Sequence, residues 1–440
     1  NMGSVLDEFC GSKLWDSNLT WNTESPSFTP CFEKTFLIWI PCIVLWLLSP
    51  LEIFYLLNSK ARDIPWSFFN IPKLLSTTCL ILLNAADIVA AITESTQQVV
   101  SPVHFWTPAM QMITFVLVLG LTFLNKRQGL RTSGVIFTFW CLLAIAGWPH
   151  LITEIHNIAE SRTKFQSETY LIYYLLVLVS LVLNIFSDVA PRISPFSKDK
   201  IICPEVTASF VSRLTFSWFN HLAWLGNKQP LLSENLWSMR PQDTSINIIR
   251  QFNKYWTPAV EKYIRVKGNP EKKKRQISVL WPLIRAFVPA TSIGFLYKLF
   301  GDLLAFLNPY ILRLLIAFIS SNDPKWQGYM YAVLLFLVAE GQTLFQTHST
   351  YIMYELGLRI RASLVSVIYR KALRTGSSSR KGTTVGQIVN LMAVDAQVFF
   401  ELMQFLNLGW GAPITIAISF YLLWQAIGIA ALAALLVMLV

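Results

Sequence analysis

The stretch GYMYAVLLFLVAEGQTLFQTHSTYIMYELGLRIRASLVSVIYRKAL, residues 328–373, has the pattern of one uninterrupted helix. No proline occurs between Pro324 and Pro413. The roughly 46 residues span about 68 Å at a rise of 1.5 Å each, whereas the hydrocarbon of a bilayer needs only about 30 Å. We therefore expect this helix to project roughly 35 Å beyond a membrane. It then turns at TGSSSRKG (375–382), and an equally long helix returns.

The composition places the rest of the chain in a membrane as well. Of 440 residues, 54% are hydrophobic and 14% are charged, with a mean hydropathy of +0.47. A soluble domain carries about 25% charged residues. Charge-poor apolar segments of spanning length lie at 36–57, 74–93, 106–125, 133–152, 169–187 and 291–319. Span seven begins near Gly328, span eight ends near Trp424, and span nine begins near Ile427.

These segments predict an all-α, polytopic membrane protein: a five-span N-terminal bundle, followed by the first long helices of a second transmembrane domain. We divide the chain into a tail (1–35), a five-span domain (36–187), a linker (188–281) and the first part of a core domain with spans six to eight and part of nine (282–440). Because span nine is cut at Val440, we expect the N-terminal part of a longer protein.

The distribution of basic residues predicts the orientation. Lys60, Arg62, Lys73 and the run KRQGLR (126–131) fall in loops on one side, whereas the loop at 94–105 has no Lys or Arg. The positive-inside rule then puts the N-terminus outside and the linker in the cytoplasm. The linker carries 15 Lys and Arg against 7 Asp and Glu between Asp188 and Trp281. Beside membrane spans, this charge favours anionic lipid over nucleic acid as the partner.

The tail carries signs of an oxidising compartment. Asn18-Leu19-Thr20 is a glycosylation sequon, and it falls on the side predicted to be outside. Cys10 and Cys31 flank it, so they form either a disulfide or two unpaired thiols. Within the linker, ASFVSRLTFSWFNHLAWLG (208–226) spaces apolar residues as one amphipathic helix would. That helix either lies flat in the bilayer interface or packs on protein.

No site for chemistry is evident. GSSSRKGT (376–383) lacks the second Gly-Lys pair of a phosphate-binding Walker A loop. The six cysteines have no metal-ligand spacing, and no nucleophile–base pair stands out. We predict no catalytic residue, metal site or cofactor in these residues.

Polar residues inside the spans are costly and therefore need a role. Lys298 and Asp302, four residues apart, form either a neutralised ion pair or a cationic point in an aqueous cavity. Polar stripes on spans seven and eight either join helices or line the same cavity; they comprise Gln342, Gln346 and Thr350, and Gln404, Asn407 and Gly411, with Phe405 and Trp410 nearby. Aromatic rings, amides and a lysine suit an amphipathic organic anion. In the first bundle, we expect Glu52, Asn84 and Asp87 to form interhelical hydrogen bonds, with a ligand or proton path as the alternative.

A short polar stretch, KGTTVGQIVNLMAVDAQ (381–397), follows the turn. Val385 and Ile388 begin an apolar face, while Gln387 and Asn390 lie off it. Thr383 or Thr384 is positioned to cap the returning helix. The pattern favours a helix that contacts a partner, the alternative being a solvated turn.

Several motifs resemble the multidrug-resistance-associated subfamily C of ABC transporters. They are WDSNLTWNTESPSFTPCF (15–32), CPEVTASFVSRLTFSWF (203–219), QPLLSENLWSM (229–239), YRKAL (369–373) and TVGQIVNLMAVDAQ (384–397). The resemblance implies a type IV ABC exporter transmembrane domain after the five-span bundle. It also implies nucleotide-binding domains that hold ATP and Mg, and a glycosylated tail outside the cell membrane.

The resemblance implies roles for particular residues. Lys298 matches a cationic position of the family in span six, and Phe405 and Trp410 match aromatic positions in span eight, so we expect all three to contact substrate. Gln346 and Thr350 stand where relatives have larger groups, and Gly301 stands where some have histidine, which leaves glutathione conjugates open as substrates. The segment at 384–397 corresponds to a coupling helix that docks on a nucleotide-binding domain; its residues are Val385, Gln387, Ile388 and Asn390. The implied function is ATP-driven export of amphipathic organic anions, drugs and conjugates; the alternative is a sulfonylurea-receptor-like channel regulator.

Overall fold

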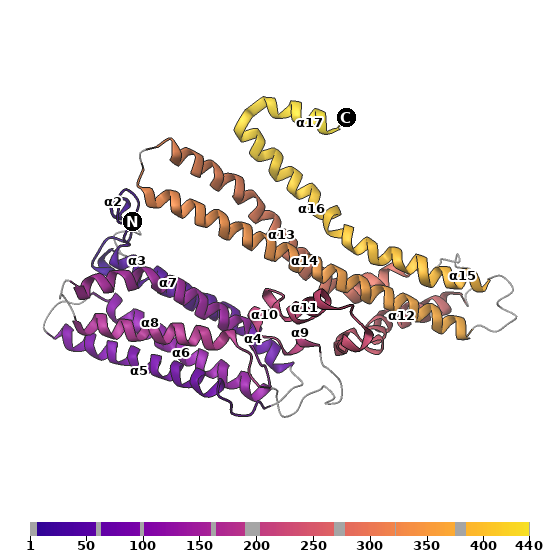
Figure 1. Ribbon diagram of the computed structural model, residues 1–440, viewed down its shortest axis with the longest axis horizontal. Coiled ribbons are helices and arrows are strands. Elements are labelled where there is room, and N and C mark those ends of the chain that lie inside the picture. Colours follow the sequence, from indigo (N-terminus) through magenta and orange to yellow (C-terminus); the bar gives the residue numbers. More distant parts are fainter. Residues whose placement is uncertain are drawn as a thin grey trace. The chain divides into compact units, whose positions relative to one another are not determined.

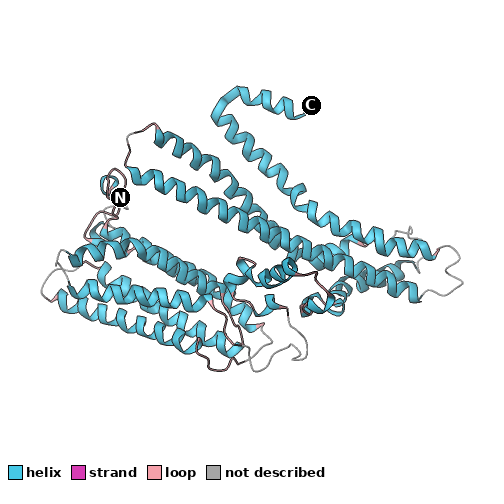
Figure 2. Cartoon of the chain, in the orientation of Figure 1, coloured by secondary structure: helices cyan, strands magenta, loops and turns pink. Residues whose placement is uncertain are grey.

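The computed structural model describes residues 7–58, 63–96, 101–159, 164–189, 203–267, 278–321, 323–374 and 384–439. Within these ranges the chain is helical and has no strand, as predicted (Figure 2). Eight helices in the described ranges are long and apolar enough to cross a membrane. The chain divides into two compact units, Asn1–Ser238 and Met239–Val440, so the division falls inside the predicted linker.

The first unit is a bundle of spanning helices (Figure 1). Its members are α4 (Phe36–Leu57), α5 (Asn70–Ser95), α6 (Val103–Gln128), α7 (Gly134–Ala159) and α8 (Lys164–Ile185). They match the predicted spans, and their ends differ from the predicted ends by a few residues. Aromatic side chains fill the core, because a bundle buried on all inner faces needs large apolar groups. Phe115 stacks on Trp140 at 5.8 Å between ring centroids, and Phe139 meets Trp140 at 5.2 Å.

The N-terminal tail is folded onto one end of this bundle. It contains α2 (Ser17–Thr20) and α3 (Pro30–Lys34), which runs into α4. Cys10 and Cys31 form a disulfide and are buried with Val103 of α6. The Thr107 hydroxyl of α6 donates to the carbonyl of Lys34 at 2.7 Å. Asn18 is exposed on α2, with its backbone amide capped by the Asp16 carboxylate.

A buried ion pair closes the opposite end of the bundle. The Lys73 amine and the Asp188 carboxylate lie 3.2 Å apart with under a tenth of either side chain exposed. Arg131 Nε donates to the backbone carbonyl of Asp188 at 2.7 Å. Burial raises the pKa of the Asp188 carboxyl, while the positive charges of Lys73 and Arg131 oppose that shift. Lys60 and Arg62, which are also predicted on this side, lie outside the described residues.

The prediction of one continuous linker helix over 208–226 is wrong. The segment is broken into short pieces: α9 (Pro204–Thr207), α10 (Phe210–Leu214), η1 (Ser217–Phe219) and α11 (Asn220–Lys228). Phe216 adopts a left-handed conformation with φ of 55°, which ends the helical path. Phe210 packs on protein, with its ring 5.7 Å from that of Phe137 on α7. Trp224 is 66% exposed, and a place for it in the bilayer interface stays a prediction.

The second unit contains the long hairpin. The short turn η2 (Ser233–Asn235) still belongs to the first unit, and the second unit begins with the turn η3 (Pro241–Asp243). The elements that follow are α12 (Ser245–Lys267), α13 (Leu280–Ile319), α14 (Lys325–Arg374), α15 (Val385–Asn390), the π-helical turn η5 (Leu391–Asp395), α16 (Ala396–Ile427), η6 (Gly428–Ala430) and α17 (Ala431–Leu439). Helix α14 has 50 residues and contains the whole predicted stretch, which confirms the long helix. The turn at 375–382 and the basic run EKKKRQ (271–276) lie outside the described residues.

Helix α12 in the linker was not predicted, and it anchors the hairpin. Its Ile248 and Phe252 are buried against Phe287 of α13 and Met353 of α14. Gln251 donates to the carbonyl of Ala286 at 2.8 Å. Elsewhere the helices of the hairpin bury few apolar residues. In the most apolar stretches of α13, α14 and α15–α16, 0 to 6% of the residues are buried, against 22 to 33% in the spanning helices of the first unit. Those apolar faces therefore require lipid or further helices to cover them.

Candidate functional site

Lys298 and Asp302 of α13 form an ion pair where α13 meets α16. The Lys298 amine lies 2.5 Å from the Asp302 carboxylate, with 14% and 17% of the two side chains exposed. Gly411 of α16 lies against them, because a Cβ there would be in ordinary van der Waals contact with Asp302 Oδ2 at 3.4 Å and with Lys298 Cε at 3.8 Å. Of the two predicted alternatives, the structure has the neutralised pair. Lys298 retains two further N–H donors for another ligand.

Trp410 lies at the same helix contact. Its ring is 4.8 Å from Phe295 of α13, one turn before Lys298. The indole N–H donates to the Asn407 amide oxygen at 3.5 Å, a long contact. Lys298 and Trp410 are thus brought together between α13 and α16, as a shared site requires. A cavity beside them, lined by Asp302 and Trp410, measures about 10 Å³. That is roughly the space of one water molecule, so these helices alone do not enclose an organic ligand.

A hydrogen-bond chain crosses the interior of the three helices. Asn407 of α16 donates to the Ser349 hydroxyl of α14 at 2.8 Å, and Ser349 donates to the carbonyl of Gly294 on α13 at 2.8 Å. Ser349 is fully buried. A serine in a helix usually hydrogen-bonds to the backbone of its own helix, so the sequence around Ser349 did not indicate that it joins two other helices. The predicted alternative of polar residues that join helices therefore holds for Asn407.

The polar stripe on α14 divides into two parts. Gln342 accepts from the Asn308 side chain of α13 at 2.8 Å, so it faces its neighbour. Gln346 and Thr350 are exposed, and the Thr350 hydroxyl donates to the Gln346 carbonyl at 2.9 Å. A spacing of four residues rotates each side chain by about 40° around the helix. The stripe therefore turns out of the α13–α14 contact along its length, although Gln346 still lies beside Gly301.

Phe405 is not gathered with the other predicted site residues. Its side chain is 65% exposed. It stands two positions from Asn407, about 200° around the helix, and Asn407 faces α14. Phe405 therefore points away from the contact that holds Lys298 and Trp410.

An ion network missed by the sequence reasoning joins the middle of the linker to α14. Asp243 accepts from Arg240 at 2.6 Å and from Arg359 at 2.8 Å. Arg240 also reaches Glu355 at 2.7 Å, and Glu355 pairs with Arg359. The two arginines alternate with the two carboxylates, so each charge has neighbours of opposite sign. Residues 116 positions apart in the sequence make these contacts, which is why no local pattern predicted them.

The predicted coupling residues form a short, capped, exposed helix. Thr384 accepts from the Gln387 amide, and the Gln387 side chain accepts from the Thr384 amide, which is a capping box. Val385 is 74% exposed, Gln387 and Asn390 are exposed, and Ile388 is partly exposed. The π turn that follows is a form often found at functional sites. Thr383 and Gly382 lie outside the described residues.

The first bundle has intramembrane polar groups of its own. Asn125 donates to the Glu52 carboxylate at 3.0 Å between α6 and α4, which is the expected interhelical hydrogen bond. Asn84 bonds the Leu80 carbonyl of its own helix instead, at 2.8 Å. Asp87 lines a cavity and is considered below. Among the described residues, no group of His, Cys, Asp and Glu is arranged to hold a metal ion.

Comparison with known proteins identifies both units. The family described as the ABC transporter TMD0 domain matches residues 8–157, and that described as the ABC transporter transmembrane region matches residues 291–440. ATP-binding cassette sub-family C member 3 of Mus musculus is 35% identical over 97% of this chain, and that of Homo sapiens is likewise 35% identical over 97%. Sub-family C member 2 of Mus musculus is 29% identical over 96%.

The chain spans about 30% of the length of these curated relatives. Both domains of the membrane part occur in the order expected from the sequence motifs. The chain is a multi-pass membrane protein in contact with a lipid bilayer, and it belongs to subfamily C of the ABC transporters.

Proposed function

We propose that the complete protein is an ATP-driven exporter of amphipathic organic anions, drugs and conjugates. One observation carries this proposal: Gln346 and Thr350 are exposed on a membrane-spanning helix beside the α13 segment that holds Lys298. Polar groups are unfavourable against hydrocarbon, so they face water or other protein. A solvated path along α13 and α14 accounts for their position.

Each predicted site residue has a distinct role in this path. Lys298 offers its remaining N–H donors to an anionic group, which must compete with Asp302 for the amine. Gln346 and Thr350 orient polar parts of the substrate. Trp410 supplies an aromatic wall beside the lysine, and Phe405 supplies a separate apolar surface on the far face of α16. Because the described helices enclose only a small space there, further helices would complete the cavity.

Energy would enter through α15. In this proposal Val385, Gln387, Ile388 and Asn390 dock on a nucleotide-binding domain, which holds ATP and Mg²⁺ outside these 440 residues. Closure of two such domains would move α14 and α16 together, because they meet closely where Gly357 faces Phe400. The cavity would then change from facing inward to facing outward. The proposal puts the protein in the cell membrane with its N-terminus outside and Asn18 glycosylated.

Substrate-stimulated ATP hydrolysis tests the proposal. The complete protein, purified in nanodiscs, is assayed with a panel of organic anions that includes glutathione and glucuronide conjugates and unconjugated parent compounds. We expect saturable stimulation by anionic members of about two-fold or more, and less by neutral parents. Hydrolysis that no panel member changes, together with co-purification of an ion channel, would favour the channel-regulator alternative and refute export.

A further inference from the structure

A cavity of about 140 Å³ lies inside the first unit, at the end of the bundle that carries the folded tail. A single water needs roughly 10–15 Å³, so the space admits a small organic molecule. Its walls come from α3 and from each helix of the bundle; they include Lys34, Asp87, His104, Gln111, Glu154 and Tyr170. This cavity takes no part in the proposed transport function.

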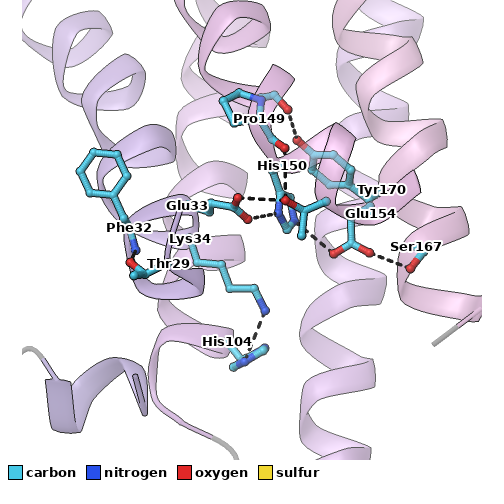
Figure 3. Close-up of polar contacts among 12 residues, drawn as sticks. Thr29, Phe32, Glu33, Lys34, His104, Pro149, His150, Glu154, Ser167 and Tyr170 are labelled. Carbon is cyan, nitrogen blue, oxygen red and sulfur yellow. Dashed lines mark hydrogen bonds and ion pairs between the residues drawn. The ribbon is translucent and has the colours of Figure 1, made fainter. Parts of the chain in front are cut away.

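One wall is a fixed network of hydrogen bonds (Figure 3). His150 Nδ1 lies 2.7 Å from the Glu33 carboxylate, which also accepts from Thr153 at 3.1 Å. His150 Nε2 faces Glu154 at 3.6 Å, and Glu154 accepts from Ser167 at 2.6 Å. These groups satisfy one another, so the wall has a definite shape without any ligand.

Asp87 is different, because it lines the cavity with no hydrogen bond or ion pair in the part of the chain that the structure describes. Among the residues that line the cavity, Lys34 is the only lysine or arginine, and it forms no ion pair with Asp87 in the described structure. A carboxylate within a span needs a counter-charge or a proton. The unpaired carboxylate of Asp87 therefore favours a cationic occupant over an anionic one.

Lys34 does not supply the missing counter-charge. Its amine lies 3.5 Å from His104 Nε2, and its electrostatic partners are Glu154, Glu33 and Glu94 rather than Asp87. The positive charge of Lys34 thus offsets the charges of Glu33, Glu154 and Glu94. Asp87 is left facing the open space.

Aromatic rings complete the site. Tyr170 and Tyr173 line the cavity, with ring centroids 5.6 Å apart. Their hydroxyls are already engaged: Tyr170 donates to the Gly147 carbonyl at 2.9 Å, and Tyr173 accepts from Gln111 at 3.0 Å. Both side chains line the cavity, and aromatic rings attract ammonium groups. Glu94 is exposed nearer the opening, where its charge would attract cations.

We propose that this cavity binds a small organic cation, an amine or quaternary ammonium group, with Asp87 as its counter-ion. The same chemistry occurs in a free amine and in the head group of a choline lipid. The site would let such a molecule stabilise the packing of the tail against the bundle, independently of export.

Direct binding of choline tests the proposal. The complete protein is placed in phosphatidylglycerol nanodiscs, and binding of radiolabelled choline is measured with and without its uncharged carbon isostere, neopentyl carbinol. We expect saturable choline binding that the isostere does not displace, because the isostere matches choline in shape but lacks the charge. Displacement by the isostere at matched concentration would overturn the proposal.

Variants locate the site. Asp87→Asn should weaken choline binding by about tenfold or more, because it removes the counter-ion. Glu94→Gln, at an exposed position that tolerates change, should weaken it about two-fold in a salt-sensitive way. Asp63→Asn removes a carboxylate that pairs with Lys126 elsewhere in the unit, and it serves as the matched control with unchanged binding. Unchanged binding in Glu94→Gln at low salt and in a correctly folded Asp87→Asn protein would overturn the proposal.

The lipid composition separates the two sources of the cation. If a lipid head group occupies the cavity, choline binding should weaken in phosphatidylcholine nanodiscs relative to phosphatidylglycerol nanodiscs. If the natural ligand is a free amine, choline should bind equally in both. Either result supports a cation site, whereas absence of choline binding in both lipids would overturn it.

Discussion

Lys298 shows how one contact changes the meaning of a residue. A lone lysine in a membrane span would attract anions over a wide region, but the Asp302 carboxylate lies 2.5 Å from its amine. The pair has almost no net charge at a distance, so it contributes little to long-range steering. Its role must be local, through the N–H donors that Asp302 leaves open. We therefore expect the anionic group of a substrate to compete with the Asp302 carboxylate for the Lys298 amine.

Separate substitutions in the pair test this competition. Lys298→Met should raise the KM for transport of an anionic dye such as carboxyfluorescein about tenfold, the loss of one charged contact. Asp302→Asn should leave the KM unchanged or lower it, because the amine is then free for the substrate. Saturation curves for uptake into inside-out vesicles give both values.

Lys325→Met, at an exposed position at the start of α14, is the matched control for loss of a lysine. An unchanged KM in Lys298→Met would show that the lysine has no direct role. Equal losses in Lys298→Met and Asp302→Asn would show that the pair only holds α13 in place.

At the scale of elements, α15 is a helix whose stability depends on its cap. With only six residues, Val385–Asn390 is too short to be stable from backbone hydrogen bonds alone. The capping box at Thr384 and the continuation into the π turn and α16 hold it in place. Its apolar residues are exposed, which favours a surface that another domain covers.

Loss of the cap should loosen this helix. Thr384→Ala removes the side-chain oxygen that accepts from the Gln387 amide, at a cost of about 1 kcal/mol. Amide hydrogen exchange over 385–390 should become about fivefold faster, while exchange over α14 is unchanged. Thr384→Ser keeps the acceptor and should exchange as the wild type does. Equal exchange in Thr384→Ala and wild type would mean that the cap does not support α15.

Charge on the surface of α15 should uncouple transport from hydrolysis. We expect Val385→Asp or Ile388→Asp to lower the number of substrate molecules transported per ATP about fivefold or more, because a carboxylate opposes an apolar contact. Substrate binding should persist. Val398→Asp, also exposed but on α16 three residues after the π turn, is the control with normal coupling. Wild-type coupling in both α15 variants would remove the proposed docking role.

The elements also show what a sequence can predict. Spans and the 50-residue helix α14 follow from local patterns of apolar residues, and these were predicted. The packing of α12 and the Asp243–Arg359 ion pair depend on partners far away in the chain, which local patterns do not indicate. The break at Phe216 requires a left-handed conformation that a phenylalanine rarely adopts, so the helical pattern did not indicate it either. In the candidate site, Lys298, Asn407 and Gln342 were recognisable because polar residues are rare in spans. Ser349 was not, since a helical serine normally needs no partner.

At the scale of the whole molecule, the two units differ in how complete they are as packed bodies. The first buries its aromatic core and a cavity among its own helices. The second has a packed base around α12 and long, bare helices beyond it. A body of the first kind can have a stable structure by itself, whereas one of the second kind depends on lipid and on other domains. The proposed export is therefore a property of the complete protein, with α13, α14 and α16 as one side of the path.

ATP-dependent uptake into inside-out membrane vesicles tests that central claim most directly. Vesicles that contain the complete protein are given carboxyfluorescein with ATP or with a non-hydrolysable ATP analogue. The account predicts saturable uptake into the vesicle lumen that requires ATP hydrolysis and falls when outside osmolarity shrinks the lumen. Equal accumulation with ATP and with the analogue, both for carboxyfluorescein and for each organic anion of the panel, in protein that still hydrolyses ATP, would contradict ATP-driven export.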